Sequence, residues 1–129
     1  MADKTVIRTD RAPGPFQGAP YNQAVRIGDL IFVAGQLGIV LESGELAGET
    51  VAEQTEQVMQ NMSAILEAAG SGLDKLVKTT VFLLDLGDFA GMNEVYARHV
   101  GDRPPARSTI GISQLPSGAR VEIEAIAHV

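Results

Sequence analysis

Residues 76–113 read LVKTTVFLLDLGDFAGMNEVYARHVGDRPPARSTIGIS, and this stretch predicts the order strand, helix, strand. Its first part, residues 76–84, is rich in Val, Thr, Phe and Leu and is too short for a long helix. We expect a strand there that is largely buried on both faces. Asp88 is placed to cap a helix that ends at Gly101, before a double proline. The apolar stripe of that helix consists of Phe89, Met92, Tyr96 and Val100.

Two segments near the C-terminus alternate between two kinds of side chain, as half-buried strands do. In residues 107–113, Arg107 and Thr109 share one face of the strand. In residues 120–128, four apolar side chains oppose a polar set that consists of Arg120, Glu122, Glu124 and His128. The pattern predicts two half-polar strands at the end of the chain.

The N-terminal part of the chain predicts a loop followed by a hairpin. Residues 5–23 hold three of the six prolines, so we expect a loop that wraps the domain, apart from a short strand at residues 5–8. Two short runs rich in apolar residues between residues 24 and 34 flank Gly28-Asp29, and this pattern is typical of a tight turn between paired strands.

A long helix is predicted to begin after Thr50. Thr50 and Glu53 fit a capping box, in which the hydroxyl and the carboxylate satisfy backbone amides of the first turn reciprocally. Gly70 supplies the stop, because glycine enters the left-handed C-terminal conformation without steric cost. The apolar stripe has helical spacing and consists of Val51, Val58, Met62, Ile65 and Ala69. We expect Met59 and Met62 to pack in the core.

Taken in order, these elements predict an α+β sandwich of a single domain, residues 1–129, with both helices on one face of a mixed sheet. The other face of the sheet must then meet either water or another subunit. The density of apolar residues favours a subunit, so we expect a homo-oligomer.

Composition excludes several classes of function. The 129 residues include ten Lys and Arg against sixteen Asp and Glu, and the net charge of −6 has the wrong sign for binding nucleic acid or an anionic membrane. The chain has no cysteine, which excludes disulfides, thiolate metal sites and cysteine nucleophiles. No stretch approaches the ~20 apolar residues of a membrane helix. We expect a soluble protein of the cytoplasm.

Motifs for cofactors, metals and covalent serine chemistry do not stand out. There is no phosphate-binding Gly-x-x-x-x-Gly-Lys-Ser/Thr loop, and Gly70-Ser-Gly72 follows a helix where a dinucleotide turn would follow a strand. His99 and His128 are the only histidines, so a metal site would need carboxylates from unpredicted places. No Gly-x-Ser-x-Gly elbow is present. We expect neither a cofactor nor a metal.

The polar faces of the last two strands carry the remaining chemistry. If these strands are near neighbours, Arg107 and Glu122 project into the same space. One interpretation is a cross-strand ion pair of small net stability, and periodicity alone favours it. The other is a site in which the guanidinium fork binds a small carboxylate while the glutamate orients or deprotonates water.

Several blocks of sequence occur in one order along nearly the whole chain. The C-terminal blocks are Pro105-Ala-Arg-Ser108, Ile110, Leu115-Pro116 and Val121-Glu-Ile123. The earlier blocks are Ala19-Pro-Tyr-Asn-Gln-Ala24, Gly28-Asp29, Gly35-Gln36, Ser43-Gly-Glu45 and Lys78-Thr-Thr-Val-Phe82, with Asp85-Leu86 and Asp88-Phe89. Together they closely resemble the Rid family, the reactive intermediate (enamine/imine) deaminases. Separate blocks in a fixed order are more specific than any single motif.

The resemblance implies a chorismate-mutase-like fold and a homotrimer, with sheets facing the trimer centre and active sites in clefts between subunits. It also implies the hydrolysis, without a cofactor, of 2-imino acids derived from 2-aminoacrylate or 2-aminocrotonate to 2-keto acids and ammonia. Arg107 resembles the arginine that clamps the substrate carboxylate, and Glu122 the glutamate that holds the attacking water. The substrate-binding positions implied are Tyr21, Gly35, Asn93 and Thr109. From the residues alone, Tyr21 also fits a loop anchor, Gly35 a strand end and Asn93 a solvated helix residue.

Two features depart from the family pattern. Thr109 stands where a cysteine is common, so thiol chemistry is not essential here, although the backbone amide can still bind substrate. Residues 8–20 form a slightly longer segment than usual, which bears on substrate size.

Two other functions stay open beside this one. The first is a deaminase of another enamine, such as aminomuconate or 3-aminoacrylate, and the second is a non-catalytic trimer that senses keto acids. The family also carries a ribonuclease label, which the acidic charge and the few aromatic residues of this chain disfavour.

Overall fold

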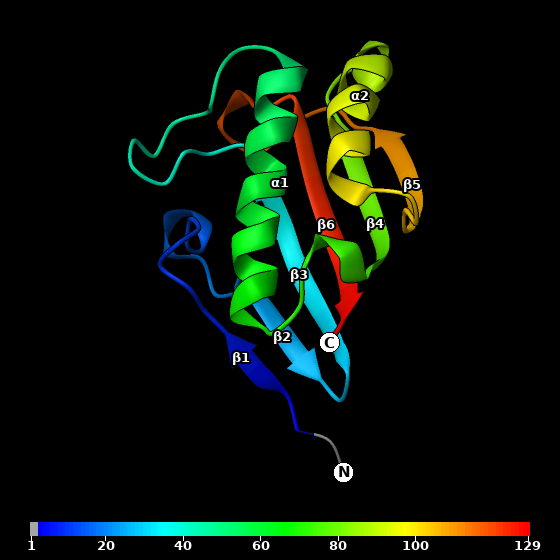
Figure 1. The fold of residues 1–129 in the computed structure, drawn as a ribbon. Helices are drawn as coiled ribbons and strands as arrows, with labels where there is room; N and C mark the ends of the chain where they lie inside the picture. Colours follow the sequence, from blue (N-terminus) through cyan, green and yellow to red (C-terminus); the bar gives the residue numbers. More distant parts are fainter. Residues whose placement is uncertain (1–2) are drawn as a thin grey trace.

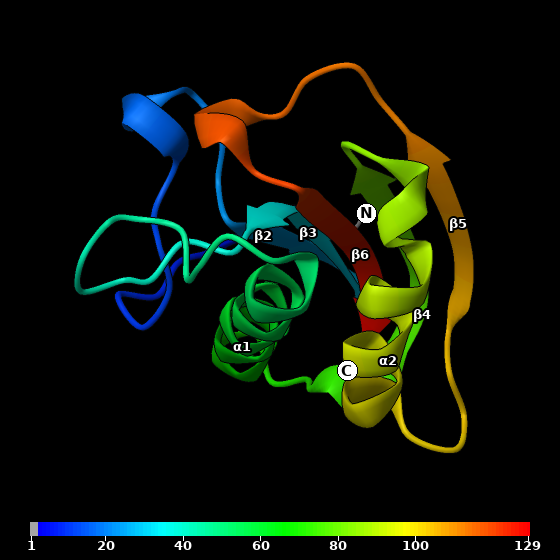
Figure 2. The same cartoon turned by 90° about the horizontal axis from the view of Figure 1, so that it is seen from above.

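A computed structural model describes residues 3–129 and shows a six-stranded sheet with two helices packed on one face (Figure 1). The strands are β1 (Thr5–Ile7), β2 (Ala24–Ile27), β3 (Leu30–Leu37), β4 (Leu76–Leu83), β5 (Ala106–Gly111) and β6 (Val121–His128). The helices are α1 (Val51–Ala68) and α2 (Phe89–Val100), with short 3-10 turns at Phe16–Gly18, Leu73–Lys75, Leu86–Asp88 and Pro116–Gly118. The predicted α+β arrangement is confirmed, and Figure 2 shows both helices on the same side of the sheet.

The strand order in the sheet is β1-β2-β3-β6-β4-β5. Neighbouring strands are antiparallel except β4 and β5, which run parallel and are connected through α2. The C-terminal strand β6 therefore lies in the middle of the sheet, and β5 forms one edge. The predicted hairpin is confirmed as the β2–β3 pair, with Gly28 in the left-handed region at its turn.

Helix α1 begins where the capping box predicts. The Thr50 hydroxyl accepts a hydrogen bond from the Glu53 backbone N–H, and the Glu53 carboxylate accepts one from the Thr50 N–H. Met59 and Met62 are fully buried between the helix and the sheet, as predicted. Neither α1 nor any other helix within residues 3–129 is long and apolar enough to cross a membrane.

Two details of α2 differ from the prediction. Asp88 precedes the helix, but its side chain makes no capping hydrogen bond, because it accepts one from the Arg120 guanidinium at 3.3 Å. Asp85 instead caps the preceding 3-10 turn by accepting from the Gly87 N–H. Phe89, expected in the core stripe, is 43 % exposed, because in the first turn of α2 it faces the Arg107 side chain.

The prediction that β4 is buried on both faces is wrong for the single chain. Val81 and Leu83 are buried under the helices, whereas Thr80 and Phe82, on the other face, are only partly buried. The reason is that both helices lie on one side of the sheet. The uncovered face, which we call the open face, carries exposed hydrophobic side chains that include Val6, Ile27, Leu30, Phe32 and Ile110.

Candidate active site

The six predicted site residues fall into two clusters of three. We call Arg107, Asn93 and Thr109 the arginine half-site, and Tyr21, Gly35 and Glu122 the glutamate half-site. Arg107 pairs with Thr79 of β4 on the helix-covered face, whereas Glu122 pairs with Phe82 on the open face. Strand β4 also separates β5 from β6. The expectation that Arg107 and Glu122 of one chain project into the same space is therefore wrong, and so is their interpretation as a cross-strand ion pair.

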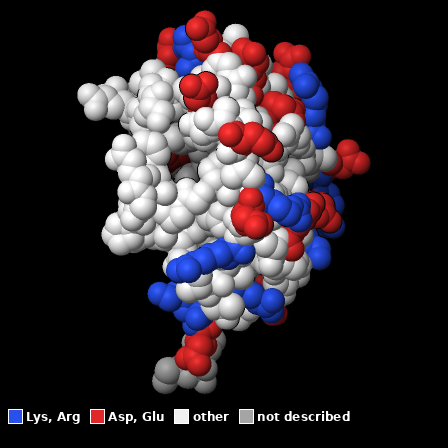
Figure 3. Space-filling model, turned by 90° about the vertical axis from the view of Figure 1, so that its left-hand side faces the viewer, with Lys and Arg blue, Asp and Glu red and all other residues white. Residues whose placement is uncertain are grey.

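The glutamate half-site lines a cavity of about 480 Å³ at one end of the sheet. The other walls come from the loop before β2 and the turn before β6, and they include Phe16, Pro116 and Ser117. Of the described residues that line this cavity, Glu122 alone is charged. Figure 3 views the molecule from the side on which these loops lie and shows one part of that face as uncharged and hollowed, with charged side chains over the remainder of the same face. The cavity thus presents one carboxylate in mostly uncharged surroundings.

Gly35 makes room for the Glu122 carboxylate. The register of β3 against β6 shifts between Val33 and Gln36, so the strand bulges where Gly35 lies. A Cβ atom at Gly35 would lie 2.5 Å from the Glu122 Oε2 atom. Any larger residue must therefore push the carboxylate aside, which is why this close approach needs glycine. Gly35 is not a strand end, because β3 continues to Leu37.

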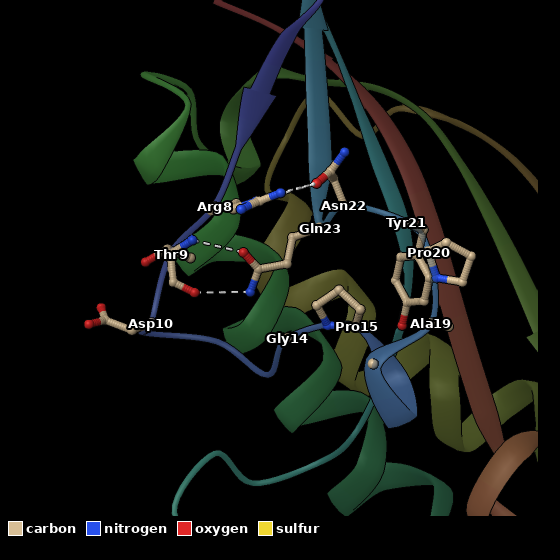
Figure 4. A pocket seen from close by; sticks show the side chains of 11 residues that line it. Arg8, Thr9, Asp10, Gly14, Pro15, Ala19, Pro20, Tyr21, Asn22 and Gln23 are labelled. Atoms are coloured by element: carbon tan, nitrogen blue, oxygen red, sulfur yellow. Dashed lines mark hydrogen bonds between the residues drawn. The ribbon is translucent and has the colours of Figure 1, made fainter.

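The Pro-rich loop that carries Tyr21 is held by Gln23, which is 3 % exposed. The Gln23 amide oxygen accepts from the Thr9 N–H at 2.8 Å, and its amide nitrogen donates to the Thr9 carbonyl (Figure 4). The same nitrogen also donates to the carbonyls of Ala12 and Pro13. Tyr21 adds a second tie, because its hydroxyl accepts from the Phe16 N–H at 2.6 Å. Tyr21 is therefore an anchor of the loop as well as a wall of the cavity.

A larger and more open hollow of about 980 Å³ borders the same loop (Figure 4). Its polar residues Arg8 and Asn22 contact each other, with the Arg8 Nη2 donating to the Asn22 Oδ1 at 3.3 Å. Neither Glu122 nor Arg107 lines this hollow. We place the candidate site at the smaller cavity because it holds the carboxylate.

The surroundings of Glu122 make it a better base than an exposed glutamate. Burial raises the pKa of the Glu122 carboxyl above its ordinary value, and the negative charge of Glu124 raises it further. A carboxylate with a raised pKa accepts a proton from water more readily. Within residues 3–129 no group of three His, Asp or Glu side chains is placed to hold a metal ion.

Arg107 is held by aromatic rings. Its guanidinium carbon Cζ lies 4.9 Å from the centroid of the Tyr96 ring and 5.5 Å from that of Phe89, and both rings come from α2. None of the ion pairs found within residues 3–129 includes Arg107. Because ring faces leave the N–H donors of the fork unpaired, this guanidinium can bind a carboxylate in bidentate fashion.

Two buried polar atoms of the arginine half-site have no hydrogen-bond partner among the described residues: Asn93 Oδ1 and Thr109 Oγ1. Thr109 follows Arg107 by two positions on β5 and therefore shares its face. Asn93 lies on α2 between Phe89 and Tyr96, at spacings that place all three on one side of the helix. Buried polar groups are normally paired, so these two atoms are candidate contacts for a ligand.

Sequence reasoning missed the rings that hold Arg107. Periodicity placed Phe89 and Tyr96 in the core, and only their shared helix face hinted at a common contact. It also missed Ser117, which lines the glutamate half-site with a left-handed backbone (φ 60°) unusual for a residue other than glycine. The Pro116–Gly118 turn was not predicted, and its place beside Glu122 depends on the strand order.

The sequence model of the family described as Endoribonuclease L-PSP matches residues 11–129. A human protein named 2-iminobutanoate/2-iminopropanoate deaminase is 43 % identical over 124 residues, which are 96 % of this chain and 89 % of that protein. The chain belongs to the Rid family.

Two further comparisons agree with this membership. A RutC family protein of Pyrococcus abyssi is 49 % identical over 125 residues, 97 % of each chain. The crystal structure of E. coli TdcF with bound serine matches with a TM-score of 0.88 and 38 % identity, covering 97 % of this chain and 98 % of that one. Some relatives are named as imine deaminases, and others only as RutC family proteins.

Proposed function

We propose that this protein hydrolyses 2-imino acids to 2-keto acids and ammonia without a cofactor. Relatives named 2-iminobutanoate/2-iminopropanoate deaminase support this reaction class. The substrate class is supported by Arg107, whose guanidinium has free donors for a carboxylate. The proposed substrates are 2-iminopropanoate, formed from 2-aminoacrylate, and 2-iminobutanoate. The proposed compartment is the cytoplasm.

The observation that carries the proposal is the division of the site into two halves on opposite sides of one sheet. Each half lacks what the other supplies, because one has a cation for the carboxylate and the other a base for water. The proposed assembly is a homotrimer in which the arginine half-site of one chain meets the glutamate half-site of the next. The open face favours such an assembly, because covering its apolar side chains removes them from water.

In the proposed reaction Arg107 binds the substrate carboxylate and fixes the orientation of the adjacent C=N bond. Glu122 of the neighbouring chain accepts a proton as water attacks the imine carbon, which forms the C–O bond and a carbinolamine. Glu122 then passes this proton to nitrogen and accepts the hydroxyl proton of the carbinolamine, so that the C=O bond forms as the C–N bond breaks and ammonia leaves. A protonated imine is already electrophilic, so the reaction needs no cofactor that accepts electrons. General-base catalysis by Glu122 raises the rate about 100-fold or more.

The experiment couples the protein to a pyridoxal-phosphate-dependent serine or threonine dehydratase and follows keto-acid release. We expect the protein to accelerate release and Arg107→Ala to abolish the acceleration. Arg98→Ala is the matched control, because Arg98 lies exposed on α2 and forms its ion pair within residues 3–129 with Glu94. No acceleration by the wild type, or full acceleration by Arg107→Ala, contradicts the proposal.

Two further outcomes identify other functions. Tight keto-acid binding without turnover would identify a sensor, and turnover confined to aminomuconate or 3-aminoacrylate would identify a dedicated deaminase. The proposal includes no nucleic-acid partner, because the chain carries a net charge of −6. RNA binding that persists in moderate salt would overturn that part.

A further inference from the structure

The Tyr96 ring is fixed at its hydroxyl end by the sheet. Its hydroxyl oxygen lies 2.6 Å from the Thr79 Oγ1 atom, and both side chains are buried. Thr79 on β4 is the register partner of Arg107 on β5. Partners in adjacent strands point to the same face, so the Thr79 and Arg107 side chains stand side by side beneath α2. Tyr96 reaches both of them from the helix.

The face of the same ring supports the guanidinium. Arg107 Cζ lies 4.9 Å from the Tyr96 centroid, inside the ~6 Å range of a cation–π contact. Phe89 offers a second ring at 5.5 Å, but it is 43 % exposed, whereas Tyr96 is 4 % exposed. Tyr96 is therefore the better fixed of the two rings.

We propose that Tyr96, pinned by Thr79, is a positioning residue that holds the Arg107 guanidinium with its fork ready for the substrate carboxylate. The effect of Tyr96 on catalysis rests on the proposed function, whereas the contact between its ring and Arg107 is a property of the free protein. Arg107 is long and flexible, so fixing its head before substrate arrives removes part of the entropy cost of binding.

A purely structural role explains the hydroxyl pair less well. A phenylalanine and a valine would fill the same space without burying two hydroxyl groups. Burial raises the pKa of the Tyr96 phenol, while the Thr79 hydrogen bond and the Arg107 charge act in the opposite direction. The phenol therefore stays neutral at neutral pH and keeps its proton for the contact with Thr79.

The contact between the Tyr96 ring and Arg107 is tested in the free protein by NMR of the Arg107 Nε–H group. Its resonance is assigned because it disappears in Arg107→Lys. We expect Tyr96→Leu to reduce the ring-current shift of this resonance to the part that comes from Phe89, and Tyr96→Phe to keep most of the shift, because the ring remains. Thr79→Val should retain the shift but increase the mobility of Nε–H. An unchanged resonance in Tyr96→Leu overturns the proposal. If that variant does not fold, unchanged Nε–H mobility in Thr79→Val overturns it.

The kinetic test uses variants that keep the ring. We expect Thr79→Val, Tyr96→Phe and the double variant each to raise KM by about tenfold, the size of one lost hydrogen bond, with kcat changed less than about twofold. Similar effects of the single and double variants would show that the two hydroxyls act as one unit. Val100→Ala, a buried α2 residue in the core, is the matched control for general destabilisation.

Two results of the kinetic test overturn the positioning role. The first is a loss of kcat at unchanged KM, and the second is an equal rise of KM in Val100→Ala. Failure of the proposed function is distinguishable from both, because it is an absence of turnover in the wild type. In that case the Nε–H resonance still decides whether Tyr96 holds Arg107.

Discussion

At the scale of single residues, the position of the Glu122 carboxylate depends on the absence of a side chain at Gly35. Gly35→Ala would place a methyl group 2.5 Å from Glu122 Oε2, so the carboxylate must move. We expect kcat to fall about 100-fold, as misplacement of a reacting group by about 1 Å can cause, with a smaller effect on KM. The coupled dehydratase assay measures both. Gly101→Ala, at the end of α2, is the control for lost stability, because Gly101 does not line the cavity and its Cβ meets nothing within 4 Å, although its φ of 68° disfavours alanine. Equal activities of the two variants would exclude this role of Gly35.

The pKa of Glu122 sets a second expectation at the residue scale. As a base Glu122 must be ionised, so kcat/KM should fall on the acid side through a pKa above the ordinary value for glutamate. Glu124→Gln removes the neighbouring negative charge, so the acid limb, the part of the pH profile in which kcat/KM falls in acid, should move to lower pH. It should stay above the ordinary position, because burial is the larger cause. Glu42→Gln, at an exposed turn, should leave the limb unmoved, and the same limb in Glu124→Gln as in the wild type would contradict the assignment.

At the scale of elements, the contact between α1 and α2 includes one hydrogen bond between side chains of the two helices. Glu56 Oε1 lies 2.9 Å from His99 Nε2, and the hydrogen bond from His99 is the first cause that lowers the Glu56 pKa. A carboxyl with a lowered folded-state pKa adds stability above its unfolded-state pKa and loses it as pH falls through the folded-state pKa. The pair is partly exposed, so we expect Glu56→Gln to cost about 0.5 kcal/mol at neutral pH.

Thermal unfolding of Glu56→Gln across pH measures this contribution. The difference in Tm from the wild type should vanish in acid, below the Glu56 pKa. Glu94→Gln, which breaks the exposed pair with Arg98 inside α2, should change Tm less. A Tm difference that stays constant with pH would mean that the Glu56 charge does not stabilise the helix pair.

Elements whose signals are local were predictable from the sequence. The capping box and the 3.6-residue period placed α1, and the Gly28-Asp29 turn placed the hairpin. The burial of β4 was not, because a run of apolar residues does not tell which faces are covered. The relation of Arg107 to Glu122 depends on the insertion of β6 between β3 and β4, a long-range pairing that no local pattern reports. The bulge at Gly35 could not be predicted from the sequence for the same reason, because it is a shift in the pairing of β3 with β6.

At the scale of the whole molecule, the open face should hold the subunits together. Ile110 is 45 % exposed on this face, so Ile110→Glu would bury a charge in any assembly that covers it. We expect light scattering to give three times the chain mass of 13.6 kDa for the wild type, and a smaller mass for Ile110→Glu. Deaminase activity should fall with the mass while circular dichroism stays unchanged. Full assembly and activity in Ile110→Glu would exclude this face as the interface.

The most direct measurement of the central claim mixes two inactive proteins. Arg107→Ala lacks the arginine half-site and Glu122→Gln the glutamate half-site, so each pure trimer should be inactive. If the halves meet between chains, random mixed trimers contain intact sites at about a quarter of all positions, and refolding the two variants together should restore about a quarter of wild-type activity. Mixed trimers that form, as shown by mass, but stay inactive would contradict a site shared between chains.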